Sequence, residues 1–159
     1  MKKVLVLDFG GQYNLLVARR VRECGVYCEI KSFRMSMEEI RAFAPDALIF
    51  TGGPATVFEP NAPMVDKALF EMGIPVLGIC YGEQLMMHLL GGQCRKAETR
   101  EYGKVELSHK ASPLFDGVPE KAVYWMSHGV EVESLAPGFE IIGSTEGCLH
   151  AADDSRRLY

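Results

Sequence analysis

Cys80 lies between two glycines, in a pattern suited to nucleophilic chemistry. The segment Gly78–Gly82 reads Gly-Ile-Cys-Tyr-Gly and connects an apolar run to a helical pattern. Such a turn is the cysteine form of the nucleophile elbow, where a Cβ in place of either glycine would collide with neighbouring backbone. A cysteine at a helix N-terminus is expected to have a lowered pKa, about 3.5–7.5, and to react as a thiolate. A buried structural cysteine is the alternative, but the strand–turn–helix context favours a nucleophile.

A nucleophile that attacks a carbonyl group also needs donors for the developing oxyanion. The backbone N–H of Tyr81, directly after the cysteine, is one candidate. Gly53 is a second, because Gly52-Gly53-Pro54 ends another predicted strand and glycine lets backbone N–H groups approach a ligand closely. Each such donor contributes roughly 10²–10³ in rate. Since Gly-Gly-Pro is also a common turn, this segment indicates a site only in combination with the cysteine.

Four histidines are available as a general base. His88 lies on the helix after the cysteine, on a different face, and we expect a structural or solvated role for it. His109 lies in a polar turn and is expected at the surface. His128 ends a predicted strand and could reach the site, whereas His150 lies inside a late strand. Spacing alone does not select either of these two as the partner of Cys80.

Strand and helix patterns alternate around the cysteine. Apolar runs predict strands that are covered on both faces, and periodic segments predict helices. This alternation predicts an α/β fold with an open, doubly wound, mostly parallel sheet, in which ligands bind at the carboxyl ends of strands. The predicted strands are 3–8, 26–31, 47–51 and 75–79, and the predicted helices are 14–24, 64–71, 83–90 and a short one opened by a capping box at 36–39.

The pattern changes after Gly92. Short strands are predicted at 105–107, 122–126, 131–133 and 139–143, which suggests a short antiparallel extension of the same domain. Two more strands are predicted at 149–152 and 158–159. Because the second has barely begun at Tyr159, we expect residues 1–159 to be a C-terminally incomplete domain of a longer polypeptide.

Composition limits the classes of partner. A chain of 159 residues suits one domain, and a net charge of -4 without a Lys/Arg-rich block argues against a nucleic-acid surface. Apolar runs are too short to cross a bilayer, so no membrane partner is expected. Five cysteines, an odd number without Cys-x-x-Cys spacing, fit a reducing cytoplasm rather than a disulfide scaffold or a metal site.

Several segments together resemble the class I, triad-type glutamine amidotransferases. The elbow continues as Glu83-Gln84, and the tyrosine after the cysteine is typical of the branch that serves guanine-nucleotide synthesis. The resemblance covers the whole chain and implies the flavodoxin-like fold of that family. The other segments that match this branch, in order, are Asp8–Tyr13, Gly52–Pro54, Arg100–Gly103, Ser112–Phe115 and Trp125–Gly129.

The resemblance implies a reaction and a set of site residues. Cys80 would attack the side-chain amide of glutamine to give a γ-glutamyl thioester and ammonia, and water would then release glutamate. The N–H groups of Gly53 and Tyr81 resemble the oxyanion hole. The residues that resemble the glutamine-binding elements are Gly52, Gln84, Ser127, His128 and Gly129.

The resemblance also implies partners. In this branch the ammonia passes to a synthetase domain of the ATP-pyrophosphatase type, fused or separate, which lies outside residues 1–159. That domain adenylates xanthosine 5′-monophosphate (XMP) and aminates it to GMP. The whole enzyme is therefore expected to be a cytoplasmic homodimer that uses glutamine, XMP, ATP and magnesium, with no cofactor in the amidotransferase domain.

Two departures from the family pattern affect these expectations. Val130 stands where an aspartate usually follows the Ser-His-Gly motif, which removes a polar contact. The family's catalytic His and Glu lie in a Phe-His-Pro-Glu segment that is expected shortly after Tyr159, so no base is assigned and the chain alone is expected to be weak or inactive. Two alternatives stay open: a non-catalytic module that binds glutamine or a partner, and another hydrolase with a cysteine elbow.

Overall fold

A parallel sheet forms the first half of the computed structural model. The structure describes residues 1–145 and 149–159, and at residues 99–101 and 150 it describes the backbone alone, so that Cys148 and the side chain of His150 lie outside it. The sheet has the order β2-β1-β3-β4, and all neighbouring strands are parallel, which confirms the predicted α/β fold. Its strands are β1 (Lys3–Asp8), β2 (Tyr27–Ser32), β3 (Ala47–Phe50) and β4 (Val76–Gly78).

Helices alternate with these strands, as predicted. They are α1 (Asn14–Glu23), α2 (Met37–Phe43) and α3 (Tyr81–Leu90). The capping box at the start of α2 is confirmed, because Ser36 and Glu39 each accept a hydrogen bond from the other's backbone N–H. Among the described helices, none is both long and apolar enough to cross a membrane.

The helix predicted over 64–71 is wrong in length and type. The chain forms only a 3-10 helix there, η1 (Lys67–Glu71). The side chain of Asp66 accepts a hydrogen bond from the N–H of Ala68 and so fixes the first turn. Gly73 follows with a φ of +73°, which leaves room for little more than one turn between the cap and this glycine.

The second half of the chain forms an antiparallel sheet of the order β6-β5-β7-β8. Its elements are β5 (Gln93–His109), η2 (Pro113–Phe115), β6 (Lys121–Ser134), β7 (Phe139–Ser144) and β8 (Leu149–Asp154). The strands predicted at 105–107, 122–126 and 131–133 are wrong in extent, because β5 and β6 pair from Gln93 opposite Ser134 to Ser108 opposite Lys121. The strand predicted at 139–143 is confirmed by β7. Backbone pairing extends β5 and β6 through stretches whose side chains show no clear apolar alternation.

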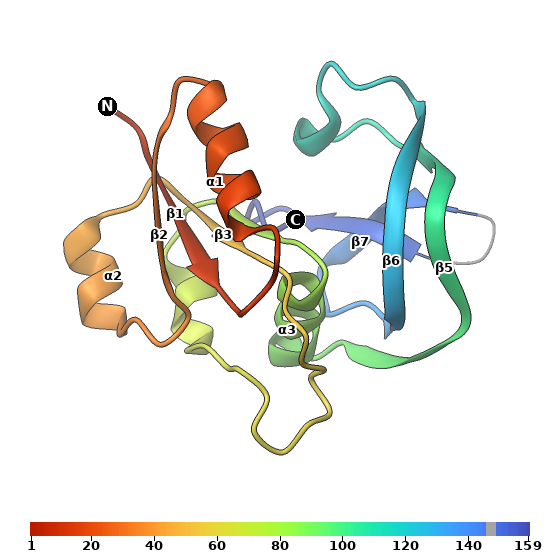
Figure 1. Cartoon of the computed structure of the whole chain (residues 1–159), viewed down its shortest axis with the longest axis horizontal. Helices are drawn as coiled ribbons and strands as arrows, with labels where there is room; N and C mark the ends of the chain where they lie inside the picture. Colours follow the sequence, from red (N-terminus) through yellow and green to blue (C-terminus); the bar gives the residue numbers. More distant parts are fainter. Residues whose placement is uncertain (146–148) are drawn as a thin grey trace.

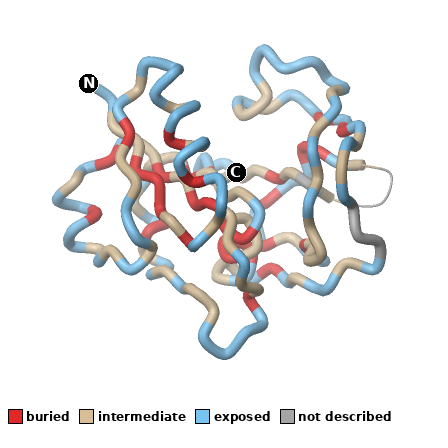
Figure 2. Tube along the Cα trace, in the orientation of Figure 1, coloured by how far each residue is buried: buried red, intermediate tan, exposed pale blue. Residues whose placement is uncertain are grey.

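Helix α3 lies between the two sheets and joins them (Figure 1). Leu85 and Met86 on this helix are fully buried and belong to the same apolar cluster as Leu5 and Phe50 of the parallel sheet. Burial is concentrated along the central strands and around α3, whereas the outer sides of α1 and α2 are exposed (Figure 2). The elbow cysteine, at the start of α3, therefore stands where the two sheets meet.

The last residues of the chain join the parallel sheet beside β4. Leu158 pairs with Val76 in the parallel sense and is fully buried. The N–H of Gly78 donates to the carbonyl oxygen of Tyr159 at 2.8 Å. The strand predicted at 158–159 thus runs in the same direction as β4, toward the end of the sheet at which Cys80 lies.

Candidate active site

The turn between β4 and α3 holds Cys80 in a strained backbone conformation. Its φ of 55° and ψ of −114° lie in a region that residues other than glycine rarely occupy. The N–H of Gly82 donates to the carbonyl oxygen of Ile79 at 3.0 Å and closes the turn. A Cβ on Gly78 would lie 2.7 Å from the backbone of α3, and one on Gly82 would lie 2.4 Å from the carbonyl oxygen of Phe50. The predicted need for both glycines is therefore confirmed.

The loop after β3 packs directly against the cysteine. A Cβ on Gly52 would lie 3.3 Å from the Cβ of Cys80 and 3.9 Å from its Sγ. Gly53 approaches the loop after β1, since a Cβ there would lie 2.3 Å from the carbonyl oxygen of Phe9. Both glycines thus lie at the edge of the sheet where the thiol emerges. Their roles toward an oxyanion or glutamine remain predictions.

Tyr81 is a buried anchor of the elbow. Its side chain is 2% exposed, its ring lies 5.5 Å from that of Phe9, and its hydroxyl donates to the carbonyl oxygen of Pro63 at 2.5 Å. Burial raises the pKa of this phenol to about 12, so the hydroxyl stays protonated as a donor. Its backbone N–H belongs to the first turn of α3, where amides have no intrahelical acceptor.

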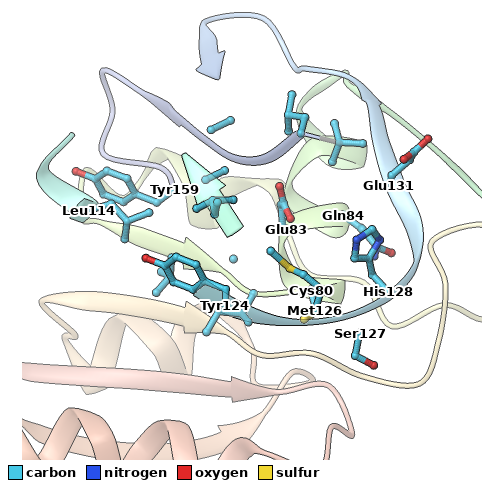
Figure 3. A pocket seen from close by; sticks show the side chains of 18 of the residues that line it. Cys80, Glu83, Gln84, Leu114, Tyr124, Met126, Ser127, His128, Glu131 and Tyr159 are labelled. Atoms are coloured by element: carbon cyan, nitrogen blue, oxygen red, sulfur yellow. The ribbon is translucent and has the colours of Figure 1, made fainter. Parts of the chain in front are cut away.

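A cavity of about 290 Å³ opens beside the cysteine, between α3 and β6 (Figure 3). Gln84 from α3 and Ser127 and His128 from β6 line it together with Cys80. The structure thus brings together four of the predicted site residues, two from each side of the junction between the sheets. Gly129 follows on β6 outside this lining. Among the side chains that the structure describes, no group of three His, Cys, Asp or Glu residues is placed to hold a metal ion.

The surroundings of Cys80 oppose its ionisation. Cys80 is exposed as a residue, but the atoms packed around its thiol partly desolvate it and raise its pKa above the ordinary value, and the nearby charge of Glu83 raises it further. The predicted lowering of this pKa is therefore wrong for the chain as it stands. The N-terminus of α3 favours the thiolate by about 0.3–1 kcal/mol and so acts in the opposite direction. Cys80 needs a further group that stabilises the thiolate.

The histidines have different surroundings. His88 is exposed, in line with a solvated role, but the surface position predicted for His109 is wrong. His109 is 9% exposed, its ring stacks on Phe115 at 4.1 Å between centroids, and both ring nitrogens lie within 3.0 Å of backbone carbonyl oxygens. These contacts come from Lys110, Phe115 and Pro119, in the segment between β5 and β6. Of the histidine side chains that the structure describes, only His128 lines the cavity.

Two further residues shape the site without any motif that marks them. The hydroxyl of Thr51 donates to the carbonyl oxygen of Leu7 at 3.0 Å and accepts from the N–H of Phe9 at 3.4 Å, so it ties the loops after β1 and β3 together. Glu83 lines the cavity beside Cys80 (Figure 3). Its spacing of three residues from the cysteine, nearly one helical turn, was the signal available in the sequence.

The chain belongs to the class-I glutamine amidotransferase family, whose family model matches residues 5–157. This match covers both sheets and α3, and it sets aside the alternative of an unrelated hydrolase with a cysteine elbow.

Curated relatives of this chain carry one description. A glutamine-hydrolysing GMP synthase of Caldicellulosiruptor saccharolyticus is 57% identical over 154 residues, which cover 96% of this chain and 30% of that protein. A second, of Lachnospira eligens, is 55% identical and covers 99% of this chain and 31% of that protein. The chain thus spans less than a third of the length of these relatives.

Solved structures share the fold. A Thermoplasma acidophilum protein assigned to the GMP synthases superposes with a TM-score of 0.91 at 29% identity, over 100% of this chain and 81% of that one. A glutamine amidotransferase of Thermotoga maritima gives 0.73 at 17% identity, over 99% of this chain and 73% of that one. Both superpositions include the antiparallel sheet, so this sheet is part of the family fold.

Proposed function

We propose that the chain is the glutamine-hydrolysing part of a GMP synthase and that Cys80 is its nucleophile. The strained elbow is the observation that carries this proposal. A strained backbone conformation persists only where the surrounding structure holds it in place, and such conformations cluster at active sites. The cavity beside the thiol has a volume suited to a small ligand and presents the polar side chains of Gln84, Ser127 and His128. Identity above half with glutamine-hydrolysing GMP synthases supports the same assignment.

The proposed reaction assigns a role to each of these groups. The Cys80 thiolate attacks the side-chain amide carbon of glutamine, and the N–H groups of Gly53 and Tyr81 stabilise the negative charge on the carbonyl oxygen. The C–N bond breaks, the nitrogen takes up a proton, and ammonia leaves the γ-glutamyl thioester. Water then attacks the thioester carbon, the sulfur leaves as thiolate, and glutamate is released. Gln84, Ser127 and His128, with the backbone of Gly52 and Gly129, hold the substrate.

The base for this reaction is proposed to follow residue 159, as the family resemblance implies. The parallel pairing of Leu158 with Val76 supports that position, since a strand continued from Tyr159 would run beside Ile79 toward Cys80. A positioned base contributes about 10²–10⁴ in rate, so the 159-residue chain alone is expected to turn over glutamine far more slowly than the complete gene product.

The proposed acceptor of the ammonia is a synthetase, fused or separate, that uses XMP and ATP with magnesium. The relatives support this, because more than two thirds of their length lies outside the part that matches this chain. The whole enzyme is proposed to be a cytoplasmic homodimer. The amidotransferase part is proposed to need no cofactor of its own, since thiol chemistry and backbone donors suffice for amide hydrolysis.

A glutaminase assay on the complete gene product tests the proposal. The wild type should release glutamate from glutamine, and Cys80→Ala should lower the rate by at least about 10³-fold. Cys24→Ala, which changes an exposed cysteine at the C-terminal end of α1, is the matched control and should leave the rate unchanged. Glutamate release that survives Cys80→Ala, or none from the wild type, would show a different function such as binding without hydrolysis.

A further inference from the structure

Glu83 places a carboxyl group inside the cavity of the candidate active site. It lies in the first turn of α3, and its side chain projects into the cavity beside Cys80 (Figure 3). Its Oε1 atom is fully buried and, among the residues that the structure describes, has no hydrogen-bond partner. A buried polar atom without a partner costs about 1–3 kcal/mol, and more if it is charged, so its retention beside a nucleophile calls for an explanation.

The carboxyl group and the two thiols near it disfavour one another's negative charge. Desolvation raises the pKa of Glu83 to about 8. Desolvation raises the pKa of Cys94 to about 11 and also raises the pKa of Cys80, and the nearby charge of Glu83 adds to the rise at both thiols. Glu83 and Cys80 thus line one cavity, where two negative charges oppose each other.

The other titratable groups of the cavity come from β6 and the end of the chain. Tyr124, His128 and Glu131 line it from β6, and Tyr159 lines it beside β4. Arg95 of β5 lies on the same sheet but forms an ion pair with Glu131 at 2.7 Å. Among the described residues, Glu83 forms no ion pair. No cation in this part of the chain therefore offsets the charge of Glu83 beside Cys80.

We propose that Glu83 is a positioning residue that controls the ionisation of Cys80. As a carboxylate it keeps Cys80 in the thiol form, and as a neutral acid, or with a hydrogen-bond donor or cation at Oε1, it allows the thiolate to form. The importance of this control for glutamine hydrolysis rests on the proposed function. Glu83 then keeps Cys80 protonated until a hydrogen-bond donor or a cation reaches its buried Oε1 atom.

The pH profile of Cys80 alkylation tests this control directly. Iodoacetamide is added between about pH 6 and pH 10, and peptide mass spectrometry follows Cys80 apart from the other four cysteines. In Glu83→Gln and Glu83→Met the midpoint of the profile should move to lower pH. Because a thiolate of lower pKa is also less nucleophilic, the rate below the midpoint should rise about threefold for each pH unit of that shift.

Glu38→Gln is the matched control, since Glu38 is exposed on α2 away from the cavity, and its profile should coincide with that of the wild type. Midpoints that stay in place or rise in both Glu83 variants would overturn the proposal. A purely structural role for Glu83 would change the thermal unfolding temperature without moving the midpoint in the same direction for Gln and Met. The assay contains no glutamine, so its outcome is separate from that of the glutaminase assay on Cys80→Ala.

Discussion

At the scale of single residues, the site combines a strained nucleophile with a carboxyl group that opposes it. The backbone of Cys80 is held in its strained conformation by the close packing of the neighbouring glycines. The ionisation of its thiol depends on the surroundings, because desolvation and Glu83 both raise its pKa. Position and reactivity are therefore set by different residues, and they can be altered separately by mutation.

Glu83 also makes the stability of the fold depend on pH. Its pKa is raised from 4.5 to about 8 on folding, so below about pH 4.5 the group is protonated in both states and its charge costs nothing. Between those values the unfolded chain releases the proton while the folded chain retains it, and stability falls by about 1.4 kcal/mol per pH unit. The stability gained by Glu83→Gln over the wild type should therefore grow by a few kcal/mol from about pH 4.5 to pH 8.

Urea unfolding of the wild type and the variant at several pH values measures this difference. Glu38→Gln, which changes a carboxyl group at the surface, should show no such growth with pH. A Glu83→Gln gain that is the same at about pH 4.5 and pH 8 would mean that folding does not raise the pKa of Glu83, which would contradict the desolvation of this group in the folded chain.

At the scale of elements, the sequence predicts the parallel half well and the antiparallel half less well. Buried strands such as β1 are continuous apolar runs, and the elbow glycines mark the junction of β4 with α3. Both features can therefore be recognised from a short stretch of sequence. The lengths of β5 and β6 depend on pairing between residues far apart in the chain, which a local pattern does not contain. The burial of His109 and the position of Glu83 beside Cys80 likewise arise from contacts made only on folding.

The elbow is expected to tolerate no side chain at Gly82. An alanine there would bring its Cβ within 2.4 Å of the backbone of Phe50, so α3 or β3 must move. We expect Gly82→Ala to lower the free energy of unfolding by about 3 kcal/mol, the upper end of the usual cost of overpacking. Gly25→Ala is the comparison, because Gly25 has open space but a φ of +74°, and strain alone should cost about 1 kcal/mol.

Chemical denaturation of both variants, read by circular dichroism, gives the two values. If Gly82→Ala and Gly25→Ala lower the free energy of unfolding equally, the added Cβ at Gly82 would be accommodated without a steric cost. That result would contradict the tight packing of α3 against β3 at the elbow.

At the scale of the whole molecule, the site exists only because two sheets meet at α3. The parallel sheet supplies Cys80 and the glycines of the loop after β3, and the antiparallel sheet supplies Ser127 and His128 across the cavity. Neither half contains a complete site. The family match over residues 5–157 includes both halves, which agrees with a single functional unit.

The most direct test of the central claim is covalent labelling of the complete gene product with an electrophilic analogue of glutamine, followed by peptide mass spectrometry. If Cys80 is the glutamine nucleophile, the adduct should form on Cys80 alone, and an excess of glutamine should slow its formation. The other cysteines of the chain should stay unmodified under the same conditions. Equal labelling of all five cysteines, or labelling of Cys80 that glutamine does not slow, would contradict the account.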